Sequence, residues 1–165
     1  MATSKEIKNE LVQDFANGYQ SFGLSKLMGR VVGLLMAHDK PLSLDEIADE
    51  LHMSKGPISQ ITRRLRDHYL IRKVWKPGSR KDFYEIEPEV FSQAFKNNFD
   101  QIKKNTKLAK KIRDKIESSD DPEIGVLYDR VNEMEHFYTI MEKHYQNFLD
   151  EWATERKKLY QKPGE

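Results

Sequence analysis

Hydrophobic positions in the first part of the chain recur at helical spacing and predict two helices. In the first, over about residues 4–20, the apolar residues are three or four positions apart and therefore share one face. They are Ile7, Leu11, Phe15 and Tyr19. A broader apolar face follows over about residues 24–38, and Pro41 ends that pattern.

The segment PLSLDEIADELHMS, residues 41–54, contains its own helix-start signal. Ser43 and Glu46 have the spacing of a capping box, in which each side chain satisfies a free backbone N–H of the first turn. A short helix is therefore expected to end near His52. Another helix starts at Ser54, and two helices joined by so short a turn cross steeply, as in a helix-turn-helix.

The helix that starts at Ser54 has an apolar face and a polar face. Pro57 lies in its first turn, where a missing N–H costs little. At 100° per residue, Ile58, Ile61 and Leu65 point to one side. The opposite side begins with small residues and continues with long hydrogen-bond donors: Gly56, Ser59, Gln60 and Arg63. This arrangement is typical of a helix whose first residues approach base edges in the DNA major groove.

A β-hairpin with a basic tip is predicted directly after this helix. Residues 71–76 and 83–87 are rich in β-branched and aromatic side chains. They flank a polar loop that starts at Pro77 and has Arg80 and Lys81 at its tip. A hairpin in this position is a wing, whose basic tip reaches phosphates or the minor groove.

Two long helices complete the predicted fold. The first extends from Pro88 to about residue 118. The second is about 38 residues long and has a heptad repeat, with apolar residues alternately three and four positions apart. A helix of that length needs another long helix to cover its apolar stripe: the 88–118 helix, the N-terminal helix, or the same elements of a second subunit.

A symmetric homodimer is the simplest of these arrangements. Its interface is expected to include Leu11, Phe15, Leu127, Val131, Met134, Tyr138, Met141, Tyr145, Phe148 and Trp152. The fold class is then mostly α with a minor β component, a winged helix-turn-helix with long N- and C-terminal dimerisation helices. The expected domains are an N-terminal helix at 1–22, the winged domain at 23–88 and a helical dimerisation region at 89–165.

Charge is concentrated in one stretch, although the 165 residues have a formal net charge of only +1. Residues 55–81 contain nine Lys or Arg residues and one acidic residue, a net charge of +8. Residues 1–54 and 118–165 carry −3 and −5. Runs of charge often only solvate a surface, but a basic stretch inside an acidic chain is the electrostatic footprint of a nucleic-acid contact.

Other function classes lack the residues they need. There is no cysteine, which excludes disulfides, thiolate metal sites and cysteine nucleophiles. No apolar run approaches the roughly 20 residues of a membrane span, and no secretory pattern opens the chain, so a cytoplasmic protein without a membrane partner is expected.

Catalytic motifs are also missing from the sequence. It contains no glycine-rich phosphate loop and no nucleophile elbow. Glu133 and His136 have the spacing of one half of a di-iron motif, but such sites require two halves. We therefore expect no enzyme, no metal and no cofactor, with a helical metal protein using this pair as the alternative.

Residues 22–91 resemble the winged helix-turn-helix of the GbsR-type branch of the MarR-like transcriptional regulators. The resemblance is most specific in SKGPIS at 54–59 and KPGSRKDFY at 76–84, and covers a little under half of the chain. Residues that match the recognition helix are Ser54, Lys55, Gly56, Ser59, Gln60, Arg63 and Arg64. Residues that match the wing are Pro77, Gly78, Arg80 and Lys81.

The resemblance implies a homodimeric regulator of transcription that binds a pseudo-palindromic operator in double-stranded DNA. A repressor is expected, with an activator as the alternative. In this hypothesis Gln60 and Arg63 read base edges. Phosphates or the minor groove are held by Lys55, Arg64, Lys76, Arg80 and Lys81. The other hypothesis is a winged-helix protein-interaction module without direct DNA binding, which the basic stretch disfavours.

A small-molecule effector such as choline or a related osmoprotectant is implied only by the resemblance to particular members of that branch. A quaternary ammonium would need an aromatic cage for cation–π binding. Candidate rings near the winged domain are Tyr19, Phe22, Trp75, Phe83 and Tyr84. Aromatic residues at helical spacing usually form core or a dimer seam, and the sequence contains no diagnostic ligand motif.

Overall fold

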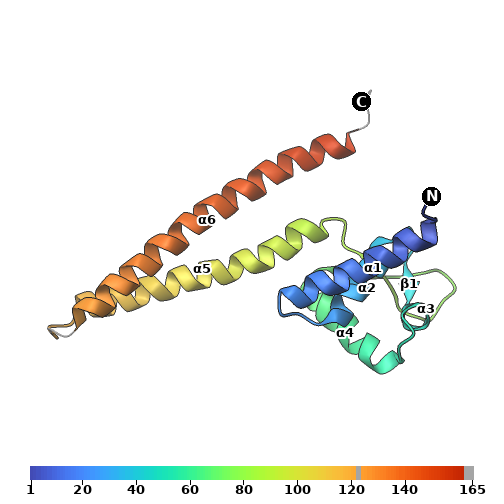
Figure 1. The fold of residues 1–165 in the computed structure, drawn as a ribbon, viewed down its shortest axis with the longest axis horizontal. Helices are drawn as coiled ribbons and strands as arrows, with labels where there is room; N and C mark the ends of the chain where they lie inside the picture. The colour runs from blue at the N-terminus through green and yellow to red at the C-terminus, as the bar shows by residue number, and fades with distance from the viewer. Residues whose placement is uncertain (122–123, 162–165) are drawn as a thin grey trace. The chain divides into compact units, whose positions relative to one another are not determined.

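The computed structural model describes residues 1–121 and 124–161. It divides into two units, Met1–Ala94 and Phe95–Glu165 (Figure 1). The elements of the first unit are α1 (Ser4–Ser21), α2 (Lys26–Met36), β1 (Leu42–Ser43), α3 (Leu44–Glu50), α4 (Lys55–Asp67), β2 (Ile71–Val74) and β3 (Phe83–Ile86). The order of helices and hairpin confirms the predicted winged helix-turn-helix and its mostly α class.

The core of the first unit contains the apolar faces that the periodicity predicted. Val31 of α2, Ile47 of α3 and Leu65 of α4 have no exposed surface. They pack in one cluster with side chains of the sheet, among them Ile71 and Tyr84. Because helices and sheet share this core, α4 and the hairpin are held in a fixed relation to each other.

The two helices α1 and α2 pack closely at Gly29. A Cβ atom at this position would lie 2.2 Å from the carbonyl oxygen of Phe15, so only glycine fits. Gly33 lies one turn further along, where a Cβ atom would be 3.0 Å from the Cα of Val12. These two glycines let α1 lie directly on α2, and α1 is therefore part of the winged unit.

The sheet has three antiparallel strands in the order β1-β3-β2. The hairpin strands pair Ile71 with Ile86 and Val74 with Phe83. The strand β1 pairs with the other edge of β3, with Leu42 opposite Tyr84. The sequence did not predict β1, because two residues are too few to show an alternating pattern.

The second unit contains the continuation of α5 (Val90–Glu117) and the whole of α6 (Gly125–Tyr160), which run antiparallel (Figure 1). Aromatic rings join the two helices: the centroids of Phe95 and Tyr145 are 4.5 Å apart, and those of Phe95 and Phe148 are 4.6 Å apart. A half-buried ion pair adds a polar contact, with Arg113 Nη1 2.7 Å from Glu135 Oε2. Among the described residues, no helix is long and apolar enough to cross a membrane.

Candidate nucleic-acid interface

The polar face of α4 lies at the surface of the first unit. Gly56, Gln60 and Arg63 are exposed, as predicted, whereas Ser59 is half-buried. A Cβ atom at Gly56 would meet no atom within 4 Å, so nothing inside the molecule requires a glycine there. Its absent side chain instead leaves the first turn of the helix open to a close partner.

The start of α4 has no side-chain cap. Ser54 occupies the N-cap position, but its side chain makes no capping hydrogen bond. An N-cap side chain accepts from the second or third helical N–H. The third residue here is Pro57, which has no N–H, so only the N–H of Gly56 could donate to Ser54. Without a side-chain cap, the positive end of the helix dipole favours an anion such as a phosphate at this surface.

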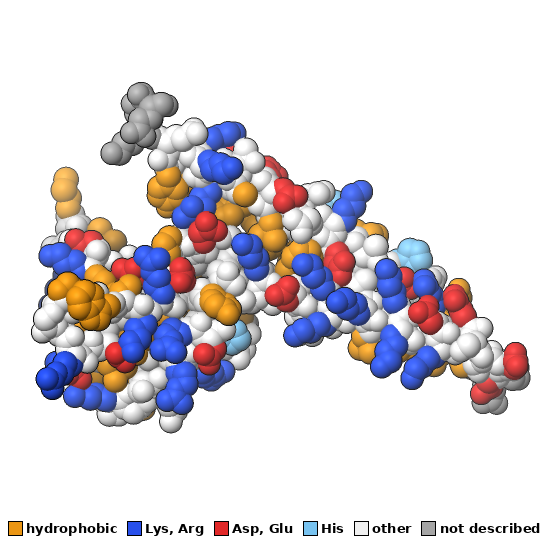
Figure 2. Space-filling view, turned by 180° about the vertical axis from the view of Figure 1, so that it is seen from behind, with side chains coloured by type: hydrophobic (Ala, Val, Ile, Leu, Met, Phe, Trp, Pro, Cys, Tyr) orange, Lys and Arg blue, Asp and Glu red, His pale blue; other side chains and the backbone are white. Residues whose placement is uncertain are grey.

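Basic side chains surround this face. Lys55 and Arg64 on α4 are exposed, and so are Lys76, Arg80 and Lys81 on the hairpin. Figure 2 shows Lys and Arg side chains gathered on the surface of the winged unit. The predicted phosphate-binding residues are therefore accessible on neighbouring elements of one unit.

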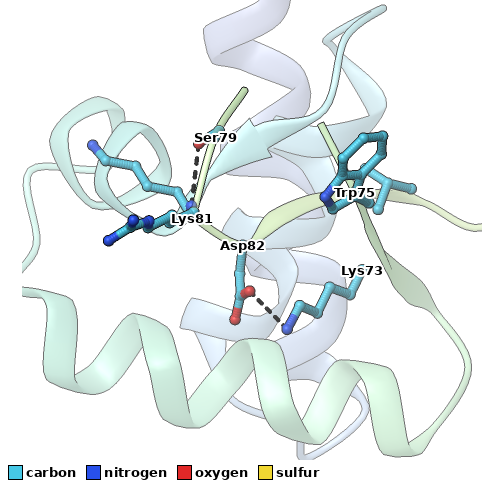
Figure 3. Close-up of a pocket in the computed structure, with 7 residues that line it drawn as sticks. Lys73, Trp75, Ser79, Lys81 and Asp82 are labelled. Atoms are coloured by element: carbon cyan, nitrogen blue, oxygen red, sulfur yellow. Dashed lines mark hydrogen bonds and ion pairs between the residues drawn. The ribbon is translucent and has the colours of Figure 1, made fainter. Parts of the chain in front are cut away.

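The hairpin loop borders an open hollow of about 580 Å³ (Figure 3). Its lining residues are Lys73, Val74, Trp75, Ser79, Arg80, Lys81 and Asp82. Asp82 pairs with Lys73 at 2.7 Å, and the backbone N–H of Lys81 donates to Ser79 Oγ at 3.1 Å. Gly78 turns the loop with a φ of +78°, a conformation that favours glycine. These contacts give the loop a definite shape.

One residue of this surface was missed from the sequence. Asp45, in the first turn of α3, pairs with Lys55 at 2.7 Å and with Lys81 at 2.9 Å. The Lys55 bond, and then the Lys81 bond, hold the pKa of Asp45 below its ordinary value. Asp45 in turn raises the pKa of Lys81. In the sequence, Asp45 is indistinguishable from any acidic residue that stabilises a helix start.

The residues of the predicted dimer interface have different environments. Phe15 is half-buried and packs against the core of the first unit. In the second unit, Val131 is buried and the ring of Tyr145 stacks on Phe95. The remaining predicted positions are half-buried or exposed: Leu11, Leu127, Met134, Tyr138, Met141, Phe148 and Trp152. Apolar residues on α6 that the prediction left out are also exposed, among them Val126, Phe137 and Ile140.

The candidate aromatic cage does not form as one accessible site. Phe83 and Tyr84 are buried, whereas Phe22 and Trp75 are exposed. The ring of Phe83 already has the Lys76 ammonium 4.8 Å from its centroid. These five rings therefore do not line a common pocket for a quaternary ammonium.

The candidate metal pair is engaged in contacts within its own helix. Glu133 pairs with Arg130 at 3.5 Å, and His136 Nδ1 lies 2.8 Å from the carbonyl oxygen of Asn132. In residues 1–121 and 124–161, no group of three or more metal-ligating side chains occurs.

Comparison with known proteins gives regulators of transcription as relatives. No protein-family model matches the chain. Over 144 residues, 79% of this chain and 78% of the relative, it is 28% identical to the HTH-type transcriptional repressor OpcR of Bacillus subtilis. Over 98 residues, 59% of this chain and 53% of the relative, it is 26% identical to the HTH-type transcriptional repressor GbsR of Bacillus subtilis.

A solved structure shows the same fold. The crystal structure of a transcriptional regulator superimposes with a TM-score of 0.73 at 23% identity, covering 89% of this chain and 98% of that one. The sequence relatives are transcriptional regulators and not enzymes, in agreement with the lack of catalytic motifs. The resemblance inferred from residues 22–91 is confirmed by these homologues.

Proposed function

Because its homologues are HTH-type transcriptional regulators that include GbsR, we propose that this chain is a DNA-binding regulator that acts as a homodimer on a pseudo-palindromic operator. The observation that carries the proposal is the exposed polar face of α4 beside a basic wing in the same unit. Such a face has the small first-turn residue and long donors that entry into a major groove requires.

The contacts divide by role. Gln60 and Arg63 read base edges, because both are exposed on the face that Gly56 opens. Arg63 can form the bidentate hydrogen bond to guanine that is the commonest specific contact in protein–DNA complexes. The lysines and arginines around this face bind phosphates and fix the register of the helix in the groove: Lys55, Arg64, Lys76, Arg80 and Lys81.

A second copy of the chain covers the apolar residues of the helical unit. Phe137 and Ile140 are 60% and 57% exposed in the single chain, which leaves large hydrophobic side chains in contact with water. In the dimer, the two α4 helices lie about 34–36 Å apart, one turn of B-DNA, which sets the half-site spacing of the operator.

The regulator is a repressor, as the names of both relatives state for those proteins. We infer a small-molecule effector such as choline or a related osmoprotectant from the resemblance to the GbsR-type branch, bound at a site other than the five rings near the winged domain. An effector that prefers one dimer geometry changes the distance between the α4 helices and hence the affinity for the operator.

The proposal is tested by selecting genomic DNA fragments that the purified protein binds, then measuring affinity over a range of salt concentrations. Binding to a common palindromic sequence is expected. Arg63→Ala should lose about 1–3 kcal/mol on that sequence and relax preference at one base position. Lys81→Ala should weaken operator and random DNA alike and reduce the salt dependence.

Two results would contradict the proposal. Equal losses on operator and random DNA for Arg63→Ala would exclude its base-reading role. Failure to retain any duplex DNA at low salt would favour the protein-interaction module instead.

A further inference from the structure

We propose that Asp45 limits the affinity of this protein for DNA, because its carboxylate binds Lys55 and Lys81. A DNA phosphate must displace this carboxylate before it can bind the two lysines. The inference rests on the proposed DNA-binding function. It assigns to Asp45 a role in setting the affinity for DNA, although its carboxylate is repelled by phosphates. Phosphate contacts supply nearly all of the affinity for DNA that lacks an operator. A carboxylate that competes for those contacts therefore restrains binding to the large excess of such sites in a genome.

The geometry of the three side chains supports competition. Oδ1 of Asp45 accepts from Lys55, at the start of α4, at 2.7 Å. Oδ2 accepts from Lys81, in the wing loop, at 2.9 Å. Each carboxylate oxygen thus binds one ammonium group, as two oxygens of a phosphate would. One acidic residue occupies a lysine from each of the two elements expected to contact DNA.

Exposure shows which partner is held in place. The side chain of Asp45 is 32% exposed, whereas those of Lys55 and Lys81 are 67% and 60% exposed. The lysines are therefore accessible to an incoming phosphate and can turn toward it, while the carboxylate stays on α3. Ion pairs between such exposed groups are weak and exchange readily.

Local structure at the start of α3 fixes Asp45 in this position. Ser43 and Glu46 form a capping box, with the backbone N–H of Ser43 donating to Glu46 Oε2 at 2.6 Å. The Glu46 carboxylate is therefore occupied with the backbone. Asp45 is the other acidic residue of the first turn, and its carboxylate is directed to the two lysines.

Displacement has a consequence that salt titration can detect. Each phosphate neutralised on B-DNA releases about 0.9 cations, which produces the salt dependence of binding. When Lys55 and Lys81 leave Asp45 for phosphates, the freed carboxylate takes up a cation from solution. This uptake cancels part of the release, so Asp45 should make the salt dependence less steep.

The experiment compares Asp45→Asn with the wild-type chain on random-sequence duplex DNA, using fluorescence anisotropy across a salt series. The variant should bind roughly three- to tenfold more tightly, with a salt slope steeper by about one. Asp49→Asn is the matched control. It removes the same charge from the same helix, and Asp49 acts on Lys81 only through longer-range attraction. A change of less than about twofold is expected for it.

A second pair of variants tests whether the gain acts through the lysines. In a background with Lys55→Gln and Lys81→Gln, Asp45→Asn should produce little further change, because no ammonium remains to be released. A full gain in that background would overturn the proposal, since Asp45 would then only repel DNA as a charge. Circular dichroism checks folding, and Asp45→Ser, which retains a first-turn acceptor, replaces the Asn variant if that one is unstable.

Two other results for Asp45→Asn would contradict the proposed competition. Weaker binding by Asp45→Asn would mean that the carboxylate positions the lysines for DNA, and unchanged binding would mean that it is a bystander. Either result overturns the inference while the DNA-binding function stands. If neither wild type nor variant binds any duplex in a salt-sensitive way, the function itself has failed.

Discussion

The winged unit and the helical unit bury their apolar residues to very different extents. In the winged unit, Val31, Ile47, Ile58 and Leu65 have no exposed surface, because helices and a sheet enclose them from several sides. In its described residues, the helical unit consists of α5 and α6, and two helices can cover only one stripe of each other. Phe99, Ala109 and Val131 are buried there, but other apolar side chains remain exposed, including Phe137 and Ile140.

This difference separates two tasks. The winged unit contains a complete core, which can hold the exposed polar face of α4 in shape by itself. The helical unit retains apolar surface, as expected for an element that pairs with a second copy. Figure 2 shows hydrophobic side chains between the charged ones on the long helices.

The largest expected effect comes from opening the core of the winged unit. Leu65→Ala should lower the free energy of unfolding by about 2–5 kcal/mol, because a fully buried side chain leaves a cavity. Leu108→Ala, at a side chain 48% exposed on α5, should change it by less than about 0.5 kcal/mol. Urea denaturation measures the free energy of unfolding of both variants. Similar losses of stability would show that the two units do not differ in how much these side chains contribute.

A charge on the exposed apolar face of α6 should act on assembly rather than on folding. Phe137→Glu should weaken self-association by about 2 kcal/mol or more, roughly thirtyfold, because it buries an unpaired carboxylate in the interface. Light scattering should then give a mass near 19.5 kDa, that of one chain, at concentrations where the wild type is a dimer.

The matched control for this prediction is Asn98→Glu, which adds the same charge at an exposed position of α5. It should leave the mass unchanged. A wild-type chain that is already monomeric at micromolar concentration would refute the proposed architecture.

The close contact between α1 and α2 gives the next effect. Gly29→Ala should destabilise the winged unit by about 1–3 kcal/mol, because its Cβ would lie 2.2 Å from the carbonyl oxygen of Phe15. At Gly18, no atom lies within 4 Å of a new Cβ. Gly18→Ala should therefore stabilise α1 by about 0.5–1 kcal/mol, because alanine favours the helix more than glycine does. The midpoint temperature of thermal unfolding, followed by circular dichroism, should therefore fall for Gly29→Ala and rise for Gly18→Ala.

The smallest effect concerns the capping box of α3 and has a defined pH dependence. Hydrogen bonds from Ser43 hold the pKa of Glu46 below its ordinary value of 4.5. The unfolded chain then takes up the proton first, so this contribution is complete above pH 4.5 and disappears as the pH falls through the folded-state pKa. Glu46→Gln should accordingly be less stable than wild type at neutral pH, with the difference shrinking in acid.

Ser43→Ala should lower stability by about 1 kcal/mol at neutral pH through loss of the cap. Thr3→Ala, which removes the corresponding cap of the exposed start of α1, should lower it by less. Equal effects would show that burial of Ser43 adds nothing to its cap.

The sequence predicted those features of the fold that depend on local periodicity and turn residues. The faces of α4 follow from the spacing of Ile58, Ile61 and Leu65, and the hairpin follows from strand-forming residues around Pro77. The sequence also shows that Pro57, the third residue of α4, cannot donate an N–H to Ser54. It does not show that the N–H of Gly56 is left without a Ser54 bond as well, which only the structure reveals.

Contacts between distant segments could not be predicted in this way. Asp45 and Lys81 are 36 residues apart, and the pairing of β1, directly before α3, with β3 brings them together. On α6, the heptad pattern predicted a single apolar stripe but not which part of it faces α5. Phe137, which widens that stripe, and Ile140 are exposed, and only the structure distinguishes the covered from the exposed side of α6.

The two tryptophans of the chain are distributed one to each unit. Trp75 lines the hollow of the hairpin loop and is 79% exposed, and Trp152 is half-buried on α6. Their emission spectra should differ, since indole fluorescence shifts to longer wavelength in water. The long-wavelength side of the emission spectrum should therefore report changes around Trp75 in the wing. The short-wavelength side should report changes around Trp152 in the helical unit.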